Sequence, residues 1–476
     1  MRHMSATQLA RLVALDPAAR PYYRALADAI RTRIMDGQIP VRLRLPAERH
    51  LAETLDVSRT TVTAAYDLLR ERGYLESRQG SGSWTALPDP AMTADNPWLS
   101  TDGDGLVQLQ VAAPPAPALL HAAMVEAVED LPRYGMGNGY DPMGLPILRE
   151  RIAAYHTARG LATRPEQIVV TTGSQHALQL VAGLLVGAGD PVLVESPTYP
   201  HAIEVMRHRG ARIVPVGISH GGWEPDLLAG SMRQSGARLA YLMPDFQNPT
   251  GALMDDATRA AVVGAARRAD TMVLVDETWT ELALDDVPRT APLAAFDTDN
   301  RVIGVGSASK LWWGGLRIGW IRATAALARR LAMYRSSVDI ASPVLEQLVV
   351  VRLFDRLAET RAERRRTLRA SRDALVTGLR TQLPEWTFTV PRGGGTLWVR
   401  LDGVGATPFA EAALTHGVRL APGPWFGLEG TLESYLRLPY TQPPQVLTDA
   451  VTRLRAARDH GPAGVVRPPD PLIAMV

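Results

Sequence analysis

The chain's only lysine lies in the stretch Ser307-Ala308-Ser309-Lys310-Leu311-Trp312-Trp313-Gly314-Gly315-Leu316-Arg317. Lysine and arginine together number 51, so the remaining basic residues of these two types are all arginine. Arginine stays protonated in proteins, whereas a desolvated lysine amine can lose its proton and form a Schiff base with an aldehyde. Hydroxyls, glycines and a fixed cation flank this amine, and a phosphorylated aldehyde needs such groups. We therefore interpret Lys310 as a covalent attachment point, and not as a surface lysine left by chance.

Outward from this stretch, short apolar runs rich in β-branched residues alternate with longer helical segments. Strands separated by helices form a mostly parallel sheet with helices on both faces, so the fold class is α/β. From about residue 330 the sequence predicts a long arginine-rich helix and then a smaller α+β subdomain. The predicted strands are Ile168–Thr171, Pro191–Glu195, Arg212–Val216, Leu239–Met243, Met272–Asp276 and Val302–Val305.

Length and composition exclude several classes of protein. The chain has 476 residues, enough for two or three domains, and its 46% hydrophobic and 21% charged residues are typical of a soluble globular protein. The absence of cysteine excludes disulfides and thiolate metal sites, and the ten histidines show no metal-ligand spacing, so we expect no metal. No apolar run is long enough to span a membrane, and the N-terminus does not resemble a signal peptide. We expect a cytoplasmic protein with no membrane partner.

Residues 21–85 have the pattern of a small DNA-binding unit. An amphipathic helix over residues 22–34 precedes two helices, 47–55 and 59–70, that are joined by a tight turn, and Ser58 is a good N-cap for the last helix. A helix-turn-helix inserts the N-terminal end of its second helix into the major groove. The segment Ser77–Ser83 suits the tip of a β-wing. The local charge agrees, because residues 1–85 contain 13 arginines and 9 acidic residues, a net charge of +4.

The motifs Arg44-Leu45-Pro46-Ala47-Glu48-Arg49, Leu51-Ala52 and Ser58-Arg59-Thr60-Thr61-Val62 carry this interpretation further. They resemble the winged helix-turn-helix of GntR-type bacterial regulators over about 65 residues. The resemblance implies that the protein binds double-stranded operator DNA. The residues that it implies as DNA contacts are Arg49, Ser58, Arg59, Thr60, Thr61, Gln79 and Gly80.

Several separate segments carry groups that pyridoxal 5'-phosphate requires. Its phosphate needs the amides of a helix N-terminus, which the strand-to-helix turn at Gly173 offers, together with the cation of Arg317. Tyr199 offers a ring to stack on, Asp276 a carboxylate for the pyridine nitrogen, and Asn248 a donor for the phenolic oxygen. The expected cofactor-binding residues within the chain are Gly173, Ser174, Gln175, Tyr199, Asn248, Asp276, Ser307, Ser309, Lys310 and Arg317.

Together, Asn248-Pro249-Thr250-Gly251, Asp276, Ser307-Ala308-Ser309-Lys310 and Arg317 resemble the fold-type I aminotransferases from about residue 108 to 457. The resemblance implies that Arg437 holds a substrate or effector carboxylate. It also implies that a tyrosine of a partner subunit reaches the phosphate, for which Tyr140 and Tyr134 are both candidates and Tyr140 is preferred. One residue departs from the pattern: Trp279 stands where the family usually has a tyrosine, which puts efficient transamination in doubt.

A winged helix, a linker and an aminotransferase-like domain resemble the MocR-type branch of the GntR family. The predicted divisions are a leader at 1–20, the winged helix at 21–85, a linker at 86–105, the aminotransferase-like domain at 106–460 and a flexible tail at 461–476. The resemblance implies a homodimeric transcriptional regulator that holds pyridoxal phosphate as an internal aldimine on Lys310 and senses a small amino compound by aldimine exchange. Two alternatives stay open: an active aminotransferase with an attached winged helix, and a regulator that senses pyridoxal phosphate itself.

Overall fold

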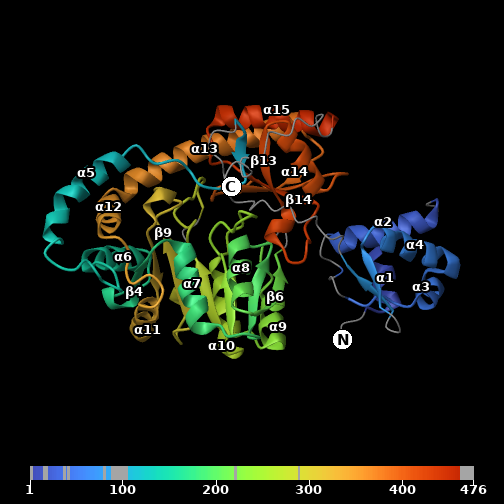
Figure 1. The fold of residues 1–476 in the computed structure, drawn as a ribbon, viewed down its shortest axis with the longest axis horizontal. Helices are drawn as coiled ribbons and strands as arrows, with labels where there is room; N and C mark the ends of the chain where they lie inside the picture. The colour runs from blue at the N-terminus through green and yellow to red at the C-terminus, as the bar shows by residue number, and fades with distance from the viewer. Residues whose placement is uncertain are drawn as a thin grey trace, which may run out of the picture.

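A computed structural model describes residues 4–13, 20–35, 39, 43–78, 82–86, 105–218, 222–287 and 290–460 of the chain. The ribbon divides into an N-terminal helical domain and a large α/β body (Figure 1). No helix in these ranges combines the length and apolar character that crossing a membrane requires.

The N-terminal domain is a helical unit with a two-stranded wing. Leu26, Ile30, Val62 and Leu69 form its buried core, and Leu9 of the first helix is buried in the same cluster. The wing is an antiparallel pair in which Leu75 lies opposite Thr85. Its elements are α1 (Ala6–Val13), α2 (Tyr22–Met35), α3 (Glu48–Leu55), α4 (Arg59–Glu71), β1 (Leu75–Arg78) and β2 (Gly82–Thr85).

A seven-stranded sheet forms the centre of the large body, in the order β4-β10-β9-β8-β7-β5-β6. All neighbouring strands are parallel except β10, which is antiparallel to both β4 and β9. The strands are β4 (Ile168–Thr171), β5 (Pro191–Ser196), β6 (Arg212–Gly217), β7 (Leu239–Leu242), β8 (Met272–Asp276), β9 (Val302–Ser307) and β10 (Gly319–Arg322).

Helices cover both faces of this sheet, and the strand sequences show why. Alternate residues of a strand point to opposite faces. Val192 and Val194 of β5 therefore join one hydrophobic cluster, while Leu193 between them joins another. The helices of the large body that precede α13 are α5 (Leu120–Asp130), α6 (Pro146–Ala158), α7 (Ser174–Leu185), α8 (Pro200–His208), α9 (Pro225–Ser235), α10 (Asp256–Arg268), α11 (Ala325–Arg335) and α12 (Val344–Asp355).

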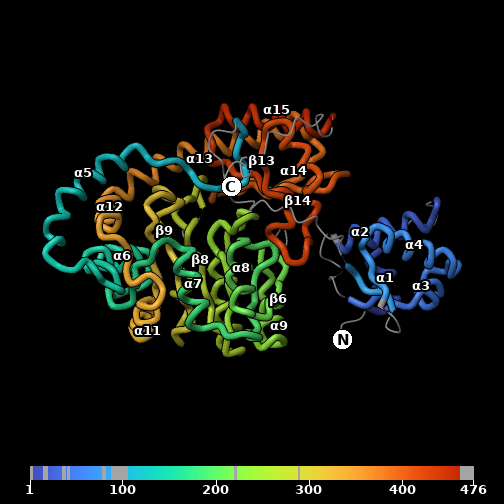
Figure 2. Tube along the Cα trace, in the orientation of Figure 1, coloured from blue at the N-terminus to red at the C-terminus, as the bar shows by residue number. Residues whose placement is uncertain are grey.

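The 26-residue helix α13 (Leu357–Gln382) leads from α12 to a smaller C-terminal subdomain, as the Cα trace shows (Figure 2). Its sheet has the order β11-β12-β14-β13-β3, and β3 is the parallel strand at its edge. The remaining elements are β3 (Val107–Leu109), β11 (Thr387–Phe388), β12 (Thr396–Arg400), α14 (Ala406–Thr415), β13 (Val418–Pro422), β14 (Tyr435–Pro439) and α15 (Pro444–His460).

The structure confirms the predicted fold class, and each predicted strand of the large sheet is present to within two residues of its expected end. The sequence analysis did not predict β10, whose four residues Gly-Trp-Ile-Arg are too short to show an alternating pattern. Most of the predicted linker and all of the predicted tail lie outside the described residues.

Candidate functional site

The predicted cofactor residues gather around the carboxyl ends of the central strands. Asp276 is the last residue of β8, Ser307 is the last residue of β9, and Lys310 follows three residues later. In open α/β sheets, ligands bind at the carboxyl ends of the strands. The strand order places β8 beside β9, and Asp276 lies opposite Val305. The fold therefore brings the predicted lysine and carboxylate to one edge of the sheet.

Lys310 is largely buried, and its amine has two neighbours. The Nζ donates a hydrogen bond to the carbonyl oxygen of Ala112 at 2.7 Å and lies 5.1 Å from the ring centroid of Trp279. Burial, with help from the positive charges of Arg437 and Arg317, lowers the pKa of Lys310 to about 8, while Asp276 opposes this change. The amine is therefore much closer to its nucleophilic form at neutral pH than an exposed lysine is.

Asp276 is fixed by two donors at the end of β8. Its Oδ2 accepts a hydrogen bond from the hydroxyl of Tyr241 at 2.8 Å, and its Oδ1 accepts one from the backbone N–H of Thr278 at 3.0 Å. Burial raises the pKa of Tyr241 well above its usual value, so the phenol remains a neutral donor. The carboxylate is thus held in one orientation, as a partner for a protonated ring nitrogen would have to be.

The turn before α7 forms a cradle of backbone amides. Gly173 caps this helix with a φ of 89°, in the left-handed region that favours glycine. Arg317 lies against it, because its Nη2 donates to the carbonyl of Thr172 at 3.2 Å and lies 2.6 Å from where a Cβ of Gly173 would be. A Cβ on Gly319 of β10 would lie 2.8 Å from the backbone nitrogen of Ser174. Free amides and a cation therefore meet in a space that side chains would fill.

Two predicted residues border this region. Ser307 accepts a hydrogen bond from the backbone N–H of Ser309 at 3.1 Å, which fixes the turn that leads to Lys310. The first turn of α7 also carries Gln175, whose buried Oε1 has no hydrogen-bond partner among the described residues. A buried polar atom without a partner is costly, so such an atom beside the cradle indicates a place for a polar ligand.

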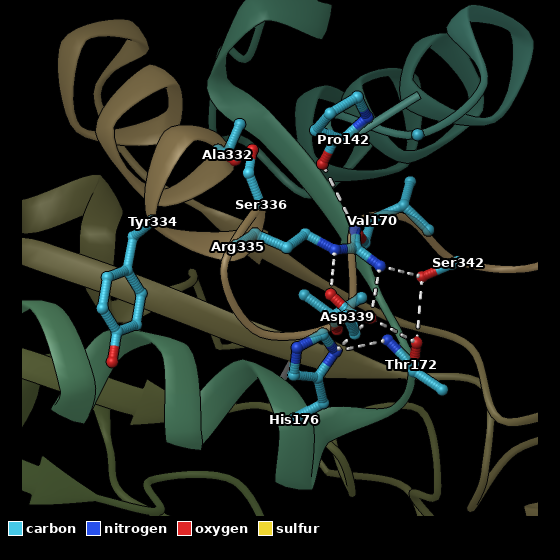
Figure 3. A network of polar contacts seen from close by, with 12 residues as sticks. Pro142, Val170, Thr172, His176, Ala332, Tyr334, Arg335, Ser336, Asp339 and Ser342 are labelled. Atoms are coloured by element: carbon cyan, nitrogen blue, oxygen red, sulfur yellow. Dashed lines mark hydrogen bonds and ion pairs between the residues drawn. The ribbon is translucent and has the colours of Figure 1, made fainter. Parts of the chain in front are cut away.

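A network of polar side chains holds the cradle from behind (Figure 3). The buried guanidinium of Arg335 binds Asp339 at 2.7 Å and the hydroxyl of Ser342 at 2.7 Å, and it donates to the carbonyl of Val170 at the end of β4. The Thr172 hydroxyl lies 3.2 Å from Asp339. These contacts tie the strand and the turn before α7 to the end of α11, so the cradle is rigid.

His176, also in the first turn of α7, belongs to the same network. Its Nδ1 accepts a hydrogen bond from the backbone N–H of Thr172 at 3.0 Å and lies 3.5 Å from Asp339. Burial is the main reason that the pKa of His176 is lowered, and the neutral ring can accept that bond. His176, Arg335 and Asp339 were not among the predicted site residues, because the contacts of Asp339 with His176 and of Arg335 with Val170 join segments more than 150 residues apart.

Arg437 on β14 is buried without an acidic partner among the described residues. One of its Nη atoms donates to Asn248 Oδ1 at 3.4 Å, the other donates to the carbonyl of Gln110, and the guanidinium stacks 4.7 Å from the ring of Phe426. Its Nε has no hydrogen-bond partner within the part of the chain that the structure describes. Burial lowers the pKa of Arg437 to about 9, so it is still a cation at neutral pH. A buried, uncompensated guanidinium suits a carboxylate ligand.

Two predicted tyrosines occupy different environments. Tyr199, at the N-terminus of α8, is partly buried. Burial raises the pKa of its phenol, Asp276 raises it further and Arg437 lowers it, so Tyr199 lies near the other site residues. Tyr140 is 67% exposed, whereas Tyr134 is partly buried. An exposed ring is what a tyrosine that completes the site of another subunit would show.

The residues described so far fit pyridoxal phosphate. They offer an amine of lowered pKa, an oriented carboxylate, a cradle of helix amides with a cation, and an amide side chain beside a free guanidinium. Among the described parts of the chain there is no cluster of three or more residues that could hold a metal ion. When bound, the cofactor supplies an electrophilic aldehyde carbon and a ring that withdraws electrons.

Among the predicted DNA-contacting residues, Ser58 precedes α4, Arg59, Thr60 and Thr61 form its first turn, and Arg49 lies in the first turn of α3. Ser58 caps α4 by accepting a hydrogen bond from the backbone N–H of Thr61 at 3.1 Å, and its hydroxyl also lies 2.7 Å from that of Thr60. The side chains of Arg49 and Arg59 are 78% and 72% exposed, so both are available to DNA. Gln79 and Gly80, predicted for the wing tip, lie outside the described residues.

Comparisons with known proteins agree with this division. Residues 109–454 match the family model of class I and II aminotransferases, and residues 22–84 match that of bacterial regulatory proteins of the gntR family. A probable rhizopine catabolism regulatory protein MocR from Rhizobium meliloti is 32% identical, over 77% of this chain and 78% of its own length. A 2-aminoadipate transaminase from Thermus thermophilus is also 32% identical, over 68% of this chain and 81% of its own length.

A solved structure resembles this chain over three quarters of its length. The crystal structure of an alpha-aminoadipate aminotransferase from Thermus thermophilus, complexed with N-(5'-phosphopyridoxyl)-L-leucine, has a TM-score of 0.69 at 29% sequence identity. The similarity covers 75% of this chain and 92% of that structure. The ligand in that crystal joins the pyridoxal phosphate skeleton to an amino acid.

Proposed function

The chain belongs to the class I and II aminotransferase family and, through its gntR-type N-terminal domain, to the MocR-type transcriptional regulators. From this premise we propose that Lys310 holds pyridoxal phosphate in a Schiff base. We further propose that the regulator senses a small amino compound that displaces this lysine. The cofactor is the one on which the family depends. Operator binding would place the protein in the cytoplasm.

The lowered pKa of Lys310, at the carboxyl end of β9, carries the proposal. An amine that remains fully protonated cannot attack an aldehyde, and burial brings the pKa of this amine to about 8. The carbonyl oxygen of Ala112 accepts a hydrogen bond from the Lys310 Nζ at 2.7 Å, which orients the nitrogen. No other lysine in the chain competes for the aldehyde.

The other proposed cofactor contacts follow from their positions. The amides of Gly173, Ser174 and Gln175 and the guanidinium of Arg317 would hold the phosphate. Asp276 would keep the ring nitrogen protonated, Asn248 would donate to the phenolic oxygen, and Tyr199 would stack on the ring. Tyr140 of a second copy would complete the phosphate site in a homodimer.

Arg437 supports an effector that carries a carboxylate. Its buried guanidinium has only neutral partners among the described residues, and its Nε is unused. A carboxylate at this place would satisfy the guanidinium, while the effector's amine reaches the carbon bonded to Lys310. The expected effector is therefore an amino acid or a related amino carboxylate.

The effect on DNA would arise from a shift between two conformers. Replacement of the Lys310 bond by the effector removes a covalent tie between cofactor and chain, and any difference in effector affinity between conformers shifts their populations. A homodimer carries two winged helices, which would meet two half-sites of an operator through Arg49, Ser58, Arg59, Thr60, Thr61, Gln79 and Gly80.

A second candidate is an active aminotransferase with an attached winged helix. The retention of Lys310, Asp276, Asn248 and Arg437 in one site favours it, because these are the groups that amino-group transfer uses. Trp279 argues against an active aminotransferase, because its indole stands where the family usually has the hydroxyl of a tyrosine. Multiple turnover of an amino acid with a keto-acid acceptor would support the enzyme, and a single exchange without turnover supports the sensor.

The proposal is tested by titrating amines and amino acids into the reconstituted protein and recording its visible absorbance. We expect wild type to show a Schiff-base band that shifts with an effector, and Lys310→Ala to lack the band. Arg437→Ala should keep the band but bind a carboxylate effector at least tenfold more weakly, since a charge-assisted pair to a buried cation contributes more than about 1.4 kcal/mol. A wild type without the band after reconstitution contradicts the proposal.

A further inference from the structure

Trp279 lies in the loop after β8 and forms one wall of the space around Lys310. Its side chain is only 3% exposed, and one face of the indole lies under the Nζ, 5.1 Å from the ring centroid. On its other edge the ring meets Gly395, where an added Cβ would lie 2.5 Å from the indole. The glycine therefore makes room for an aromatic ring of this size, and the ring cannot move away from the lysine.

The two neighbours of the amine are both suited to its charged form. The face of an indole carries partial negative charge and attracts cations, tryptophan more strongly than the other aromatic residues. The carbonyl of Ala112 accepts a hydrogen bond at 2.7 Å. The carbonyl has no hydrogen to donate, and the N–H of the indole lies in the ring plane and so does not point at an amine over the ring face. Neither contact therefore favours the neutral amine as an acceptor. The usual tyrosine of the family would place a hydroxyl here.

We propose that Trp279 and the Ala112 carbonyl form a docking site for the Lys310 ammonium after an effector amine has replaced it. This inference rests on the proposed function and concerns how the site retains its effector. In the replacement, the nitrogen of the effector forms a new C=N bond as the C=N bond to Lys310 breaks. The effector would arrive as an ammonium, and its three protons would end on the Lys310 nitrogen, so the exchange would release Lys310 as an ammonium with no proton gained or lost overall.

A docked ammonium explains why the effector would be retained and not converted. Amino-group transfer requires a base that removes the proton from the carbon bearing the effector's amine, and a released lysine amine acts as such a base only when it is neutral. Held against Trp279 and Ala112, Lys310 would stay more fully protonated at neutral pH than it would without these two contacts. The substitution of tryptophan for tyrosine would thus make a sensor from an enzyme site.

Other charged groups around the amine set the balance that Trp279 shifts. Asp276 on β8 favours the ammonium, whereas Arg437 on β14, Arg317 after β9 and burial itself oppose it. Tyr241 on β7 and Tyr199 at the start of α8 stay neutral, because burial raises the pKa of both phenols. Because these groups nearly balance the charged and neutral forms of the Lys310 amine, the contribution of the indole to its pKa is measurable.

The single lysine allows a direct measurement. Full-length protein without cofactor, grown with isotope-labelled lysine, gives one lysine side-chain signal in NMR, and its pH titration reports the pKa of Lys310. We expect Trp279→Leu to lower this pKa by about 0.5 to 1.5 and Trp279→Phe to lower it less. The matched control is Trp386→Leu, which removes another buried indole that packs on Phe409 and should leave the pKa unchanged.

Equal pKa values for Lys310 in wild type and in both Trp279 variants would overturn the inference, since a tryptophan that only fills the core would not move them selectively. Trp279 is a core residue, so Trp279→Phe and Trp279→Tyr, which keep most of the ring, decide the question if Trp279→Leu does not fold. With cofactor bound, Trp279→Tyr should form keto acid from an effector amino acid at least tenfold faster than wild type.

The same experiment separates this inference from the proposed function. A wild type that shows no Schiff-base band after reconstitution refutes the proposed function, whatever the lysine titration gives. A wild type that shows the band, with no change of pKa or turnover in the Trp279 variants, refutes only the docking site.

Discussion

Lys310 shows how a single residue can reduce the stability of a fold in return for reactivity. In the unfolded chain its pKa is near 10.5, and in the folded chain burial brings it to about 8. Below pH 8 the charged amine therefore favours the unfolded state by its full contribution. This contribution declines as the pH rises from 8 to 10.5 and then vanishes.

Replacement of Lys310 by methionine should consequently stabilise the protein without cofactor at pH 7, by roughly 1–3 kcal/mol. The difference between the variant and wild type should disappear near pH 10.5. Denaturant unfolding of both proteins across this range measures it. A difference that is independent of pH would show that the amine is not desolvated.

At the same scale, the sequence identified the residues that carry chemistry but not their neighbours. Lys310, Asp276 and Arg437 are rare or strongly patterned in the sequence, so they could be predicted. The carbonyls of Gln110 and Ala112 belong to the backbone and have no signature in the side-chain pattern. Tyr241 reads as an ordinary apolar strand residue until the structure shows its hydroxyl on Asp276.

At the scale of elements, the close contact of β10 with the start of α7 determines the shape of the phosphate cradle. A Cβ on Gly319 would lie 2.7 Å from the carbonyl carbon of Gly173 and would meet rigid backbone. Gly319→Ala should therefore weaken cofactor binding and destabilise the protein by about 1–3 kcal/mol.

The matched control for this variant is Gly230→Ala, in the middle of α9, where an added Cβ meets nothing within 4 Å. That change should stabilise the protein by about 0.5–1 kcal/mol, because alanine favours a helix, and should leave the cofactor absorbance unchanged. Thermal unfolding and cofactor titration of both variants provide the comparison. A Gly319→Ala variant that binds cofactor like wild type would remove β10 from the account of the cradle.

The recognition helix α4 supports a second prediction at this scale. Arg59 is its first residue, is 72% exposed and lies 4.0 Å from Glu48, so it is free to turn toward DNA. Arg59→Ala should weaken operator binding by about 1–3 kcal/mol and should leave the visible absorbance of the cofactor intact. Fluorescence anisotropy with a labelled operator measures the first effect. Equal operator affinity would exclude Arg59 from the contact surface.

The strands of the large sheet could be predicted because they are apolar on both faces and are separated by long helices. The antiparallel strand β10 could not, since its place between β4 and β9 depends on hydrogen bonds to segments far away in the sequence. The hydrogen bond from Arg335 to the backbone carbonyl of Val170 escaped prediction for the same reason, because it joins α11 to a strand 165 residues earlier. A long-range contact to a backbone carbonyl leaves no periodic signal in the sequence.

For the whole molecule, the proposal requires coupling between the effector site and the DNA-binding domain. Thermodynamic linkage makes such coupling reciprocal: the factor by which effector changes operator affinity equals the factor by which operator changes effector affinity. We expect a factor of roughly 5 to 150, the range typical of allosteric proteins. Parallel titrations of effector with and without operator, and of operator with and without effector, check the equality. Effector affinity that is unaffected by saturating operator would contradict the sensing mechanism.

The central claim is that the aldehyde of pyridoxal phosphate is bonded to Lys310. Borohydride reduction of the reconstituted protein, followed by peptide mass spectrometry, tests it most directly because reduction makes the bond permanent. We expect a reduced pyridoxyl group on the peptide that contains Lys310, and its loss when saturating effector is added before reduction. An unmodified Lys310 peptide from reconstituted protein without effector would show that no such bond forms.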